Sequence, residues 1–121
     1  MIEAKVFYKL TENDNNHLTD LRGFELKGHA GYAKTYCFFF KGDDIICAAI
    51  SALSLNTANA LTELTSNIVQ VIQNDDGYVN VFSETKLDDY GQLLLEAFVL
   101  GIVNIHDEYG NEFIHIKFEE V

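Results

Sequence analysis

The segment that decides the fold is residues 43–66, DDIICAAISALSLNTANALTELTS. Its apolar residues recur at the spacing of one helix face, and this stripe consists of Ile46, Ala49, Ile50, Leu53, Leu61 and Leu64. Asp43 and Asp44 precede it, and an aspartate at that place is a good N-cap. The sequence therefore predicts a helix over residues 45–66, which is the strongest helix signal in the chain.

Two strands are expected before this helix. Residues 2–9 alternate apolar and polar side chains, and residues 23–30 alternate in the same way. The polar stretch 11–20 between them predicts a loop. We expect the two strands to pair as a hairpin with a long connection.

The rest of the chain continues the alternation of strands and helices. Residues 68–72 and 78–82 flank an Asp-Gly pair, which is a hairpin signal. Residues 87–105 have helical spacing, and residues 113–118 predict a last strand. The order β-β-α-β-β-α-β indicates an α+β fold, with a five-stranded antiparallel or mixed sheet and two helices packed on it. Without proline, repeats or a Gly/Ser-rich linker, residues 1–121 are expected to form a single domain.

The net charge of the chain indicates which classes of partner to expect. Nineteen acidic residues against eight basic ones give a net charge of −11, which argues against direct nucleic-acid binding. Residues 42–121 hold fourteen of the acids and only two bases, Lys86 and Lys117. This asymmetry favours a basic partner by electrostatic steering, although an acidic surface that serves solubility gives the same pattern.

The expected location is the cytoplasm, with no contact with a membrane. No stretch of about 18 residues lacks a charged or polar break, so no membrane-spanning helix is expected. The amino terminus does not resemble a signal peptide. Two cysteines, Cys37 and Cys47, cannot build a disulfide framework and suit a reducing compartment.

Motifs for metals and cofactors are missing from the sequence. The four histidines and two cysteines are scattered rather than grouped at ligand spacings, so no metal site is expected. Neither a phosphate-binding glycine motif nor the GxSxG of serine hydrolases occurs. We therefore expect no cofactor.

Cys47 is the candidate nucleophile. At about the third position of the predicted helix, unpaired N–H groups and the helix dipole would favour the thiolate. The N–H groups of Cys47 and Ala48 could also hold an oxyanion. The alternative is a small buried core residue between Ile46 and Ala48.

His29 is the candidate base, because a histidine at a strand end and a cysteine at a helix start form a minimal catalytic pair. Gly28 beside it would allow an unusual torsion or a close backbone approach. Ser51 lies four residues after Cys47 on the same helix face, where it could bond the thiolate or simply its own helix. Asp44 could orient His29 or serve only as an N-cap.

The segments GHAGYA (28–33) and GDDIICAAISAL (42–53) closely resemble the ribosomal-processing cysteine proteases of Firmicutes and related bacteria. The resemblance covers nearly the whole chain. It implies a cytoplasmic homodimeric endopeptidase with Cys47 as nucleophile and His29 as base, supported by Gly28, Asp44 and Ser51. Its implied substrate is the precursor of ribosomal large-subunit protein twenty-seven, a basic protein whose amino-terminal extension is cut after an aromatic pair. No metal or cofactor is implied.

The link between the two motifs is longer than in that family, through residues 34–41 with their sequence KTYCFFFK. Two roles are open for this insert. Phe38–Phe40 packs into the substrate groove, or the insert only adds a strand or a hydrophobic flap. Cys37 is expected to be inert. An extended substrate is expected to pair with the strand that bears Gly28.

Two other functions stay open at this point. A non-catalytic module could bind a basic ribosomal or assembly protein through the acidic face. A thiol hydrolase could instead act on small esters or amides. Replacement of Cys47 by alanine separates them, because a binding module would be indifferent to it.

Overall fold

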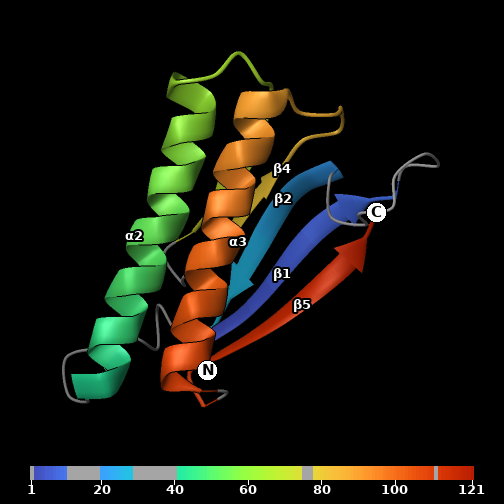
Figure 1. Cartoon of the computed structure of the whole chain (residues 1–121). Coiled ribbons are helices and arrows are strands. Elements are labelled where there is room, and N and C mark those ends of the chain that lie inside the picture. Colours follow the sequence, from blue (N-terminus) through green and yellow to red (C-terminus); the bar gives the residue numbers. More distant parts are fainter. Residues whose placement is uncertain (1, 11–19, 29–40, 75–77, 111) are drawn as a thin grey trace.

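A computed structural model of the protein describes residues 2–10, 20–28, 41–74, 78–110 and 112–121, and of residues 41–44 only the main chain. The elements in these residues are β1 (Ile2–Lys9), β2 (Asp20–Lys27), α2 (Lys41–Glu63), β3 (Gln70–Gln73), β4 (Val79–Phe82), α3 (Asp89–Tyr109) and β5 (Ile114–Glu120) (Figure 1). Their order is the predicted β-β-α-β-β-α-β.

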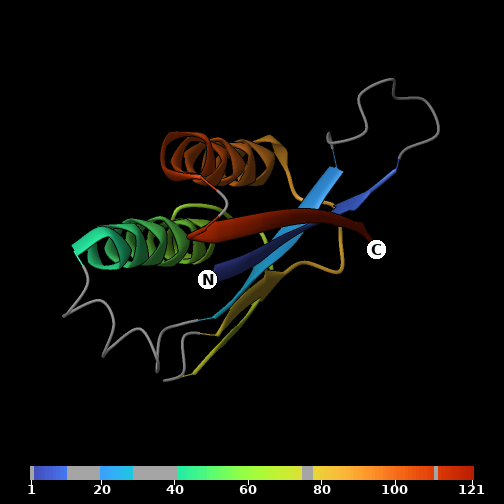
Figure 2. The ribbon, with the colours of Figure 1, turned by 90° about the horizontal axis from the view of Figure 1, so that it is seen from below.

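The strands form one mixed sheet in the order β3-β4-β2-β1-β5. β1 pairs with β2, β2 with β4, and β4 with β3, all antiparallel, whereas β5 lies parallel to β1. Both helices lie on the same face of this sheet (Figure 2). The predicted α+β architecture is therefore confirmed.

The core lies between the sheet and the helices, where alternate strand residues meet the buried stripes of α2 and α3. Phe24 of β2 stacks on Phe98 of α3, with ring centroids 4.0 Å apart. The two helices run antiparallel, and Gly101 of α3 lets Leu53 of α2 approach closely, since a Cβ there would stand 3.0 Å from Leu53 Cδ1. This packing fixes the position of α2 over the sheet.

β2 begins three residues earlier than predicted and ends at Lys27. The reason is an ion pair within the strand: Arg22 Nε donates to Asp20 Oδ1 at 2.8 Å, and both side chains are buried. Arg22 Nη1 also donates to the carbonyl of Glu84 at 2.7 Å. Two charged residues in sequence look like a loop, but their mutual neutralisation lets this end of the strand enter the interior.

A bulge distorts β2 where it faces β1. The pairing register shifts between Phe7 and Tyr8, opposite Gly23, which has φ of +155°. A Cβ on Gly23 would collide with the carbonyl oxygen of Val81 on β4. Only glycine fits this position, because backbone from the neighbouring strand occupies the space of a side chain.

α2 begins at Lys41 and ends at Glu63, so the predicted boundaries, 45 and 66, are both wrong. Asp44 is its fourth residue and cannot be the N-cap. Leu64 lies beyond the last helical residue and is 79% exposed, so it does not belong to the buried stripe. The predicted residues Ile46, Ile50 and Leu61 are buried as expected.

The turn before α3 is held by an amide. Asp88 is the N-cap of α3 and accepts a hydrogen bond from the N–H of Gly91 at 2.9 Å. Asn67, which follows α2, donates to Asp88 Oδ1 at 2.8 Å and accepts from the Asp88 N–H at 3.0 Å. Asn67 thereby joins the end of α2 to the start of α3.

By length and composition, Ile45–Glu63 is apolar enough to cross a membrane, contrary to the sequence expectation. The polar breaks within this stretch are uncharged serines, threonines and asparagines, and its one charged residue, Glu63, stands at the end. Helices that pack within a protein meet the same criterion. The buried side of α2 lies in the core described above.

Candidate active site

Cys47 lies in the first two turns of α2, and α2 begins at the end of the molecule where α3 finishes and where β2 ends (Figure 1). It is partly exposed, between the buried Ile46 and the exposed Ala48. Cys47 is therefore neither a fully buried core residue nor a fully exposed surface residue. A thiol in this position is reachable while being fixed by the helix.

Cys47 does not lie in the first turn of its helix, which was the predicted position. With Lys41 as the first helical residue, Cys47 is the seventh and Ala48 the eighth. Their N–H groups fall within the regular ladder, where each donates to the carbonyl four residues earlier. They are therefore not available as oxyanion donors, and the first turn with its unpaired groups lies before Cys47.

Ser51 lies one turn after Cys47 and is exposed, as the four-residue spacing predicts for a shared face. One turn further, Ser54 is fully buried, and its hydroxyl donates to the carbonyl of Ser51 at 3.0 Å. Thr57 makes a similar bond within α2, from its hydroxyl to the carbonyl of Leu53 at 2.7 Å. Ser54 comes seven residues after Cys47, and because this spacing returns to the same side of a helix, the sequence could have identified Ser54 as a neighbour of Cys47 on that side.

Gly28 follows β2 directly and is exposed, with φ of +144°. This torsion, which favours glycine, confirms the expectation of unusual backbone at Gly28. Gly28 is the last described residue before α2 and lies just beyond Lys27, the final residue of β2. His29, Cys37 and the segment 34–40 lie outside the described residues, as does the side chain of Asp44.

The strand that Gly28 follows, β2, has no free edge over its paired residues, so the expectation that a substrate pairs along this strand is wrong. β2 is flanked by β1 on one side and by β4 on the other, so its hydrogen-bonding groups are engaged along most of its length. The free edges of the described sheet belong to β3 and β5. Alternation alone could not reveal the order of strands.

Two of the four histidines, His106 and His115, lie in the described residues. His106, in the last turn of α3, has Nδ1 3.3 Å from Asp107 Oδ1. His115 is exposed on β5. Among the described residues, no group of three or more His, Cys, Asp or Glu side chains could hold a metal ion.

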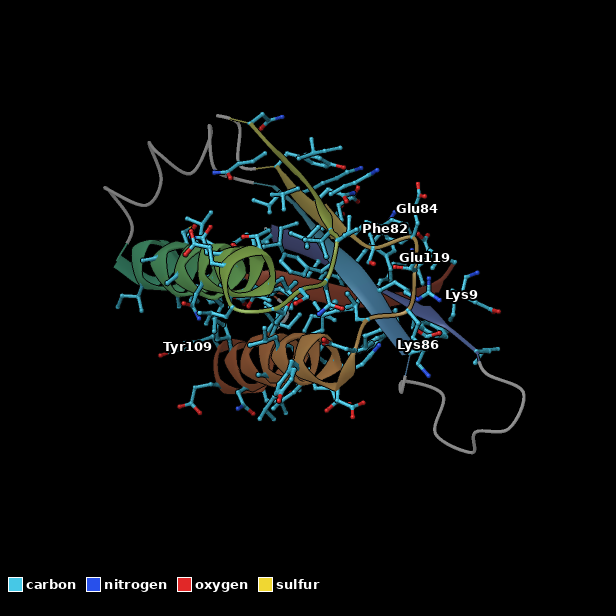
Figure 3. The ribbon with its side chains drawn as sticks, turned by 90° about the horizontal axis from the view of Figure 1, so that it is seen from above. Lys9, Phe82, Glu84, Lys86, Tyr109 and Glu119 are labelled. Carbon is cyan, nitrogen blue, oxygen red and sulfur yellow. The ribbon has the colours of Figure 1, made fainter. Side chains whose placement is uncertain are left out.

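Charged side chains of both signs gather at the opposite end of the sheet. Figure 3 shows Lys9, Glu84, Lys86 and Glu119 there, together with Phe82, whereas Tyr109 lies at the far end of α3. α3 itself holds four acidic residues and neither lysine nor arginine. α3 therefore places negative charge beside α2, and Lys9 and Lys86 lie at the opposite end of the sheet, whereas Lys27 is the last residue of β2.

Comparisons with known proteins agree on one family. The family model described as the cysteine protease Prp matches residues 1–114. A protein of Staphylococcus aureus named ribosomal processing cysteine protease Prp is 30% identical over 111 residues, which is 91% of this chain and 95% of the relative.

Solved structures share the fold over its full length. The Streptococcus mutans protein SMU.848 is 33% identical, with a TM-score of 0.77 over 100% of this chain and 99% of that one. The ribosomal processing protease Prp of Staphylococcus aureus, solved with a substrate peptide, is 24% identical with a TM-score of 0.77, covering 98% of this chain and 100% of that one. The latter likeness concerns the fold.

Proposed function

This chain belongs to the cysteine protease Prp family, and on that basis we propose that it is an endopeptidase with a Cys47–His29 pair. The observation that carries the proposal is the partly exposed Cys47 on α2, in a chain that the family model matches from residue 1 to 114. Both motifs, GHA at 28–30 and the segment 42–53, lie within the matched range.

In the proposed reaction, His29 takes the proton of the Cys47 thiol, and the sulfur attacks the carbonyl carbon of the scissile peptide bond. The resulting oxyanion collapses, the C–N bond breaks, and His29 returns the proton to the leaving amine. Water then hydrolyses the thioester by the same route and releases the acid product and the free thiol. Because the N–H groups of Cys47 and Ala48 are engaged in α2, the oxyanion donors come from outside this part of the helix.

The proposed substrate is the precursor of ribosomal large-subunit protein twenty-seven, cut after an aromatic pair in its amino-terminal extension. Support comes from a relative named for ribosomal processing and from the net charge of −11, which attracts a basic protein. Gly28, Asp44 and Ser51 are proposed as supporting positions. We place the enzyme in the cytoplasm as a homodimer, without metal or cofactor.

Mass spectrometry of a peptide that spans the host's own extension tests this proposal. Wild type is expected to cut after the aromatic pair, whereas Cys47→Ala and His29→Ala lose turnover by at least about a hundredfold. Cys37→Ala is the matched control and should retain turnover, because that cysteine is assigned no role. Equal cleavage by wild type and Cys47→Ala would assign the nucleophile to another residue.

A second measurement separates the enzyme from a binding module. Cys47→Ala should still bind the peptide with a dissociation constant close to that of wild type, as measured by fluorescence anisotropy. Binding without cleavage by wild type would support the acidic binding module instead. Activity on small thiol-hydrolase esters but not on the peptide would support a small-molecule hydrolase.

A further inference from the structure

The outward side of α3 combines carboxylates with large apolar side chains. Five exposed residues lie along it and are here called the α3 stripe: Asp89, Leu93, Glu96, Leu100 and Asp107. Leu93 is 63% exposed and Leu100 is 62% exposed. The successive spacings of four, three, four and seven residues keep the five on one side of the helix, over a length of about 27 Å. The α3 stripe is therefore a single continuous surface.

The α3 stripe faces away from the rest of the fold. Phe98 stacks on Phe24 of the sheet, and Gly101 meets Leu53 of α2, so Phe98 and Gly101 mark the inner sides of α3. A helix turns by about 100° per residue, which places the stripe roughly 140–180° from Phe98 and roughly 80–140° from Gly101. The sheet and α2 thus lie on the other sides of α3 (Figure 2).

Cys47 lies on the opposite flank of the layer that the two helices form. On α2, Leu53 is the residue that meets Gly101 of α3. Cys47 precedes Leu53 by six residues, a rotation that leaves it about 120° round α2 from the side that faces α3. α2 therefore stands between Cys47 and the α3 stripe. A polypeptide segment bound along the stripe is not the same segment as one held at Cys47.

The charge of α3 is of one sign. Its four acidic residues are accompanied by neither lysine nor arginine. Lys5, Lys27 and Lys117 of the sheet lie on the face without helices, since each alternates along its strand with residues that face the core. These three lysines cannot neutralise the α3 stripe, because the sheet separates them from it. The outward side of α3 is therefore negative and partly apolar.

We propose that the α3 stripe is a docking surface for a basic segment of the protein substrate, separate from the segment that is cut at Cys47. Lysine or arginine side chains of the docked segment pair with the carboxylates, and its apolar side chains cover Leu93 and Leu100. The inference rests on the proposed function, in which the substrate is the precursor of a basic ribosomal protein. The docked segment belongs to the part of the precursor that remains after cleavage.

Charge and apolar area together select this occupant. A second copy that placed its own α3 stripe against this one would bring carboxylates to carboxylates. Nucleic acid and anionic lipid are repelled by the same charge. An inorganic cation would leave Leu93 and Leu100 uncovered, whereas a basic polypeptide supplies apolar side chains as well as positive charge.

The test compares the full precursor with the short peptide that spans only its extension. Glu96→Lys should lower kcat/KM for the precursor by about fivefold at low ionic strength, mainly through KM, and leave the value for the peptide within about twofold. The loss should shrink as salt is added, because exposed charges are screened. Glu3→Lys is the matched control: it changes the net charge equally, but Glu3 lies on the face of β1 without helices, next to the buried Ala4. Equal losses for both substrates, or in both variants, would overturn the proposal.

The apolar part of the stripe is tested by Leu100→Gln. This variant should lower kcat/KM for the precursor by about threefold or more at every salt concentration, because the contact that it removes is not electrostatic. The value for the peptide should again stay within about twofold. A precursor that Leu100→Gln cleaves as wild type does would overturn the apolar contact. Thermal melting of each variant shows that the fold is retained.

The mature ribosomal protein supplies a second readout. Because it lacks the extension, it should bind the Cys47→Ala enzyme through the α3 stripe alone, as measured by fluorescence anisotropy. Glu96→Lys in that background should raise its dissociation constant by about fivefold, and Glu3→Lys should leave it unchanged. A mature protein that does not bind, or that binds both variants equally, would overturn the docking surface. Cleavage of the short peptide by wild type is scored separately, so failure of the protease assignment and failure of the docking surface are distinguished.

Discussion

The side-chain amide of Gln92 makes two hydrogen bonds with the main chain of Leu21. The Leu21 N–H donates to Gln92 Oε1 at 2.9 Å, and Gln92 Nε2 donates to the Leu21 carbonyl at 3.1 Å. β4 pairs with β2 only from Gly23 onward, so no β4 residue stands opposite Leu21. A residue of α3 thereby completes the hydrogen bonding of the sheet and ties the helix to β2.

Replacement of Gln92 by leucine should lower the free energy of unfolding by about 2–4 kcal/mol, because it leaves a buried N–H and a buried C=O without partners. Urea denaturation followed by circular dichroism measures this loss. Glu96→Gln, one turn later on the exposed side of α3, should change stability by no more than about 0.5 kcal/mol. A loss below about 1 kcal/mol in Gln92→Leu would mean that water replaces the amide at β2.

Gly23→Ala should destabilise the protein by about 3 kcal/mol or more, because the added Cβ meets the Val81 carbonyl and the backbone is at positive φ. Gly110→Ala is the control for torsion alone. Gly110 has φ of +89° with no atom within 4 Å of a Cβ, so we expect a smaller loss of about 1–2 kcal/mol. Equal losses in the two variants, by chemical denaturation, would contradict the steric account of the bulge.

Arg22→Met should cost about 3–5 kcal/mol of stability, since it leaves the buried carboxylate of Asp20 without its partner. The double variant Asp20→Asn/Arg22→Met should recover part of that loss. Denaturation of both single variants and the double variant gives the coupling energy. Lys5→Met serves as control, because its ion pair with Glu119 is exposed at 3.9 Å and should contribute no more than about 1 kcal/mol. Additive losses would show that the two buried charges act independently.

The bond from Asn67 should make stability depend on acid pH. The side-chain amide of Asn67, followed by the N–H of Gly91, holds the pKa of Asp88 below its usual value of 3.8. A lowered pKa gives stability that is present above the unfolded pKa and is lost as the pH falls through the folded one. The stability difference between wild type and Asn67→Ala should therefore be larger at pH 6 than near pH 2–3. An NMR titration of Asp88 should show its pKa rising in the variant, and an unchanged value would refute the assignment.

Much of the fold follows from the sequence because periodicity records which face of each element is buried. The spacing of Ile46, Ile50 and Leu61 places α2 on the sheet, and residues 2–9 coincide with β1. The start of β2 escapes such analysis, since Asp20 and Arg22 are buried only because each neutralises the other. The start of α2 cannot be located from the sequence either, because Asp43 and Asp44 suit an N-cap and equally suit the first turn of a helix.

For the candidate site, the sequence predicts which residues to consider, and the structure describes Cys47, Ser51 and the backbone of Gly28. Local motifs point to Cys47 and Gly28; Cys47 is partly exposed and Gly28 has the positive φ that its residue type allows, while their catalytic roles stay predictions. The place of Cys47 within its helix depends on a boundary that two neighbouring acids leave ambiguous. The internal position of β2 depends on strand order, which arises from contacts between distant segments and has no local signal.

The parallel pairing of β1 with β5 has a consequence for how the molecule reaches its folded state. Ile2 of β1 stands opposite Ile114 of β5, so the first strand of the described chain pairs along one side with the last. Contacts between such distant segments slow folding, because a long loop must close before they form. During synthesis, β1 keeps an open side until β5 has emerged and α3 has closed over the core. A chain interrupted before Ile114 would leave that side of β1 free to pair with strands of other molecules. We therefore expect the protein to complete its fold only late in synthesis, and truncated copies to aggregate.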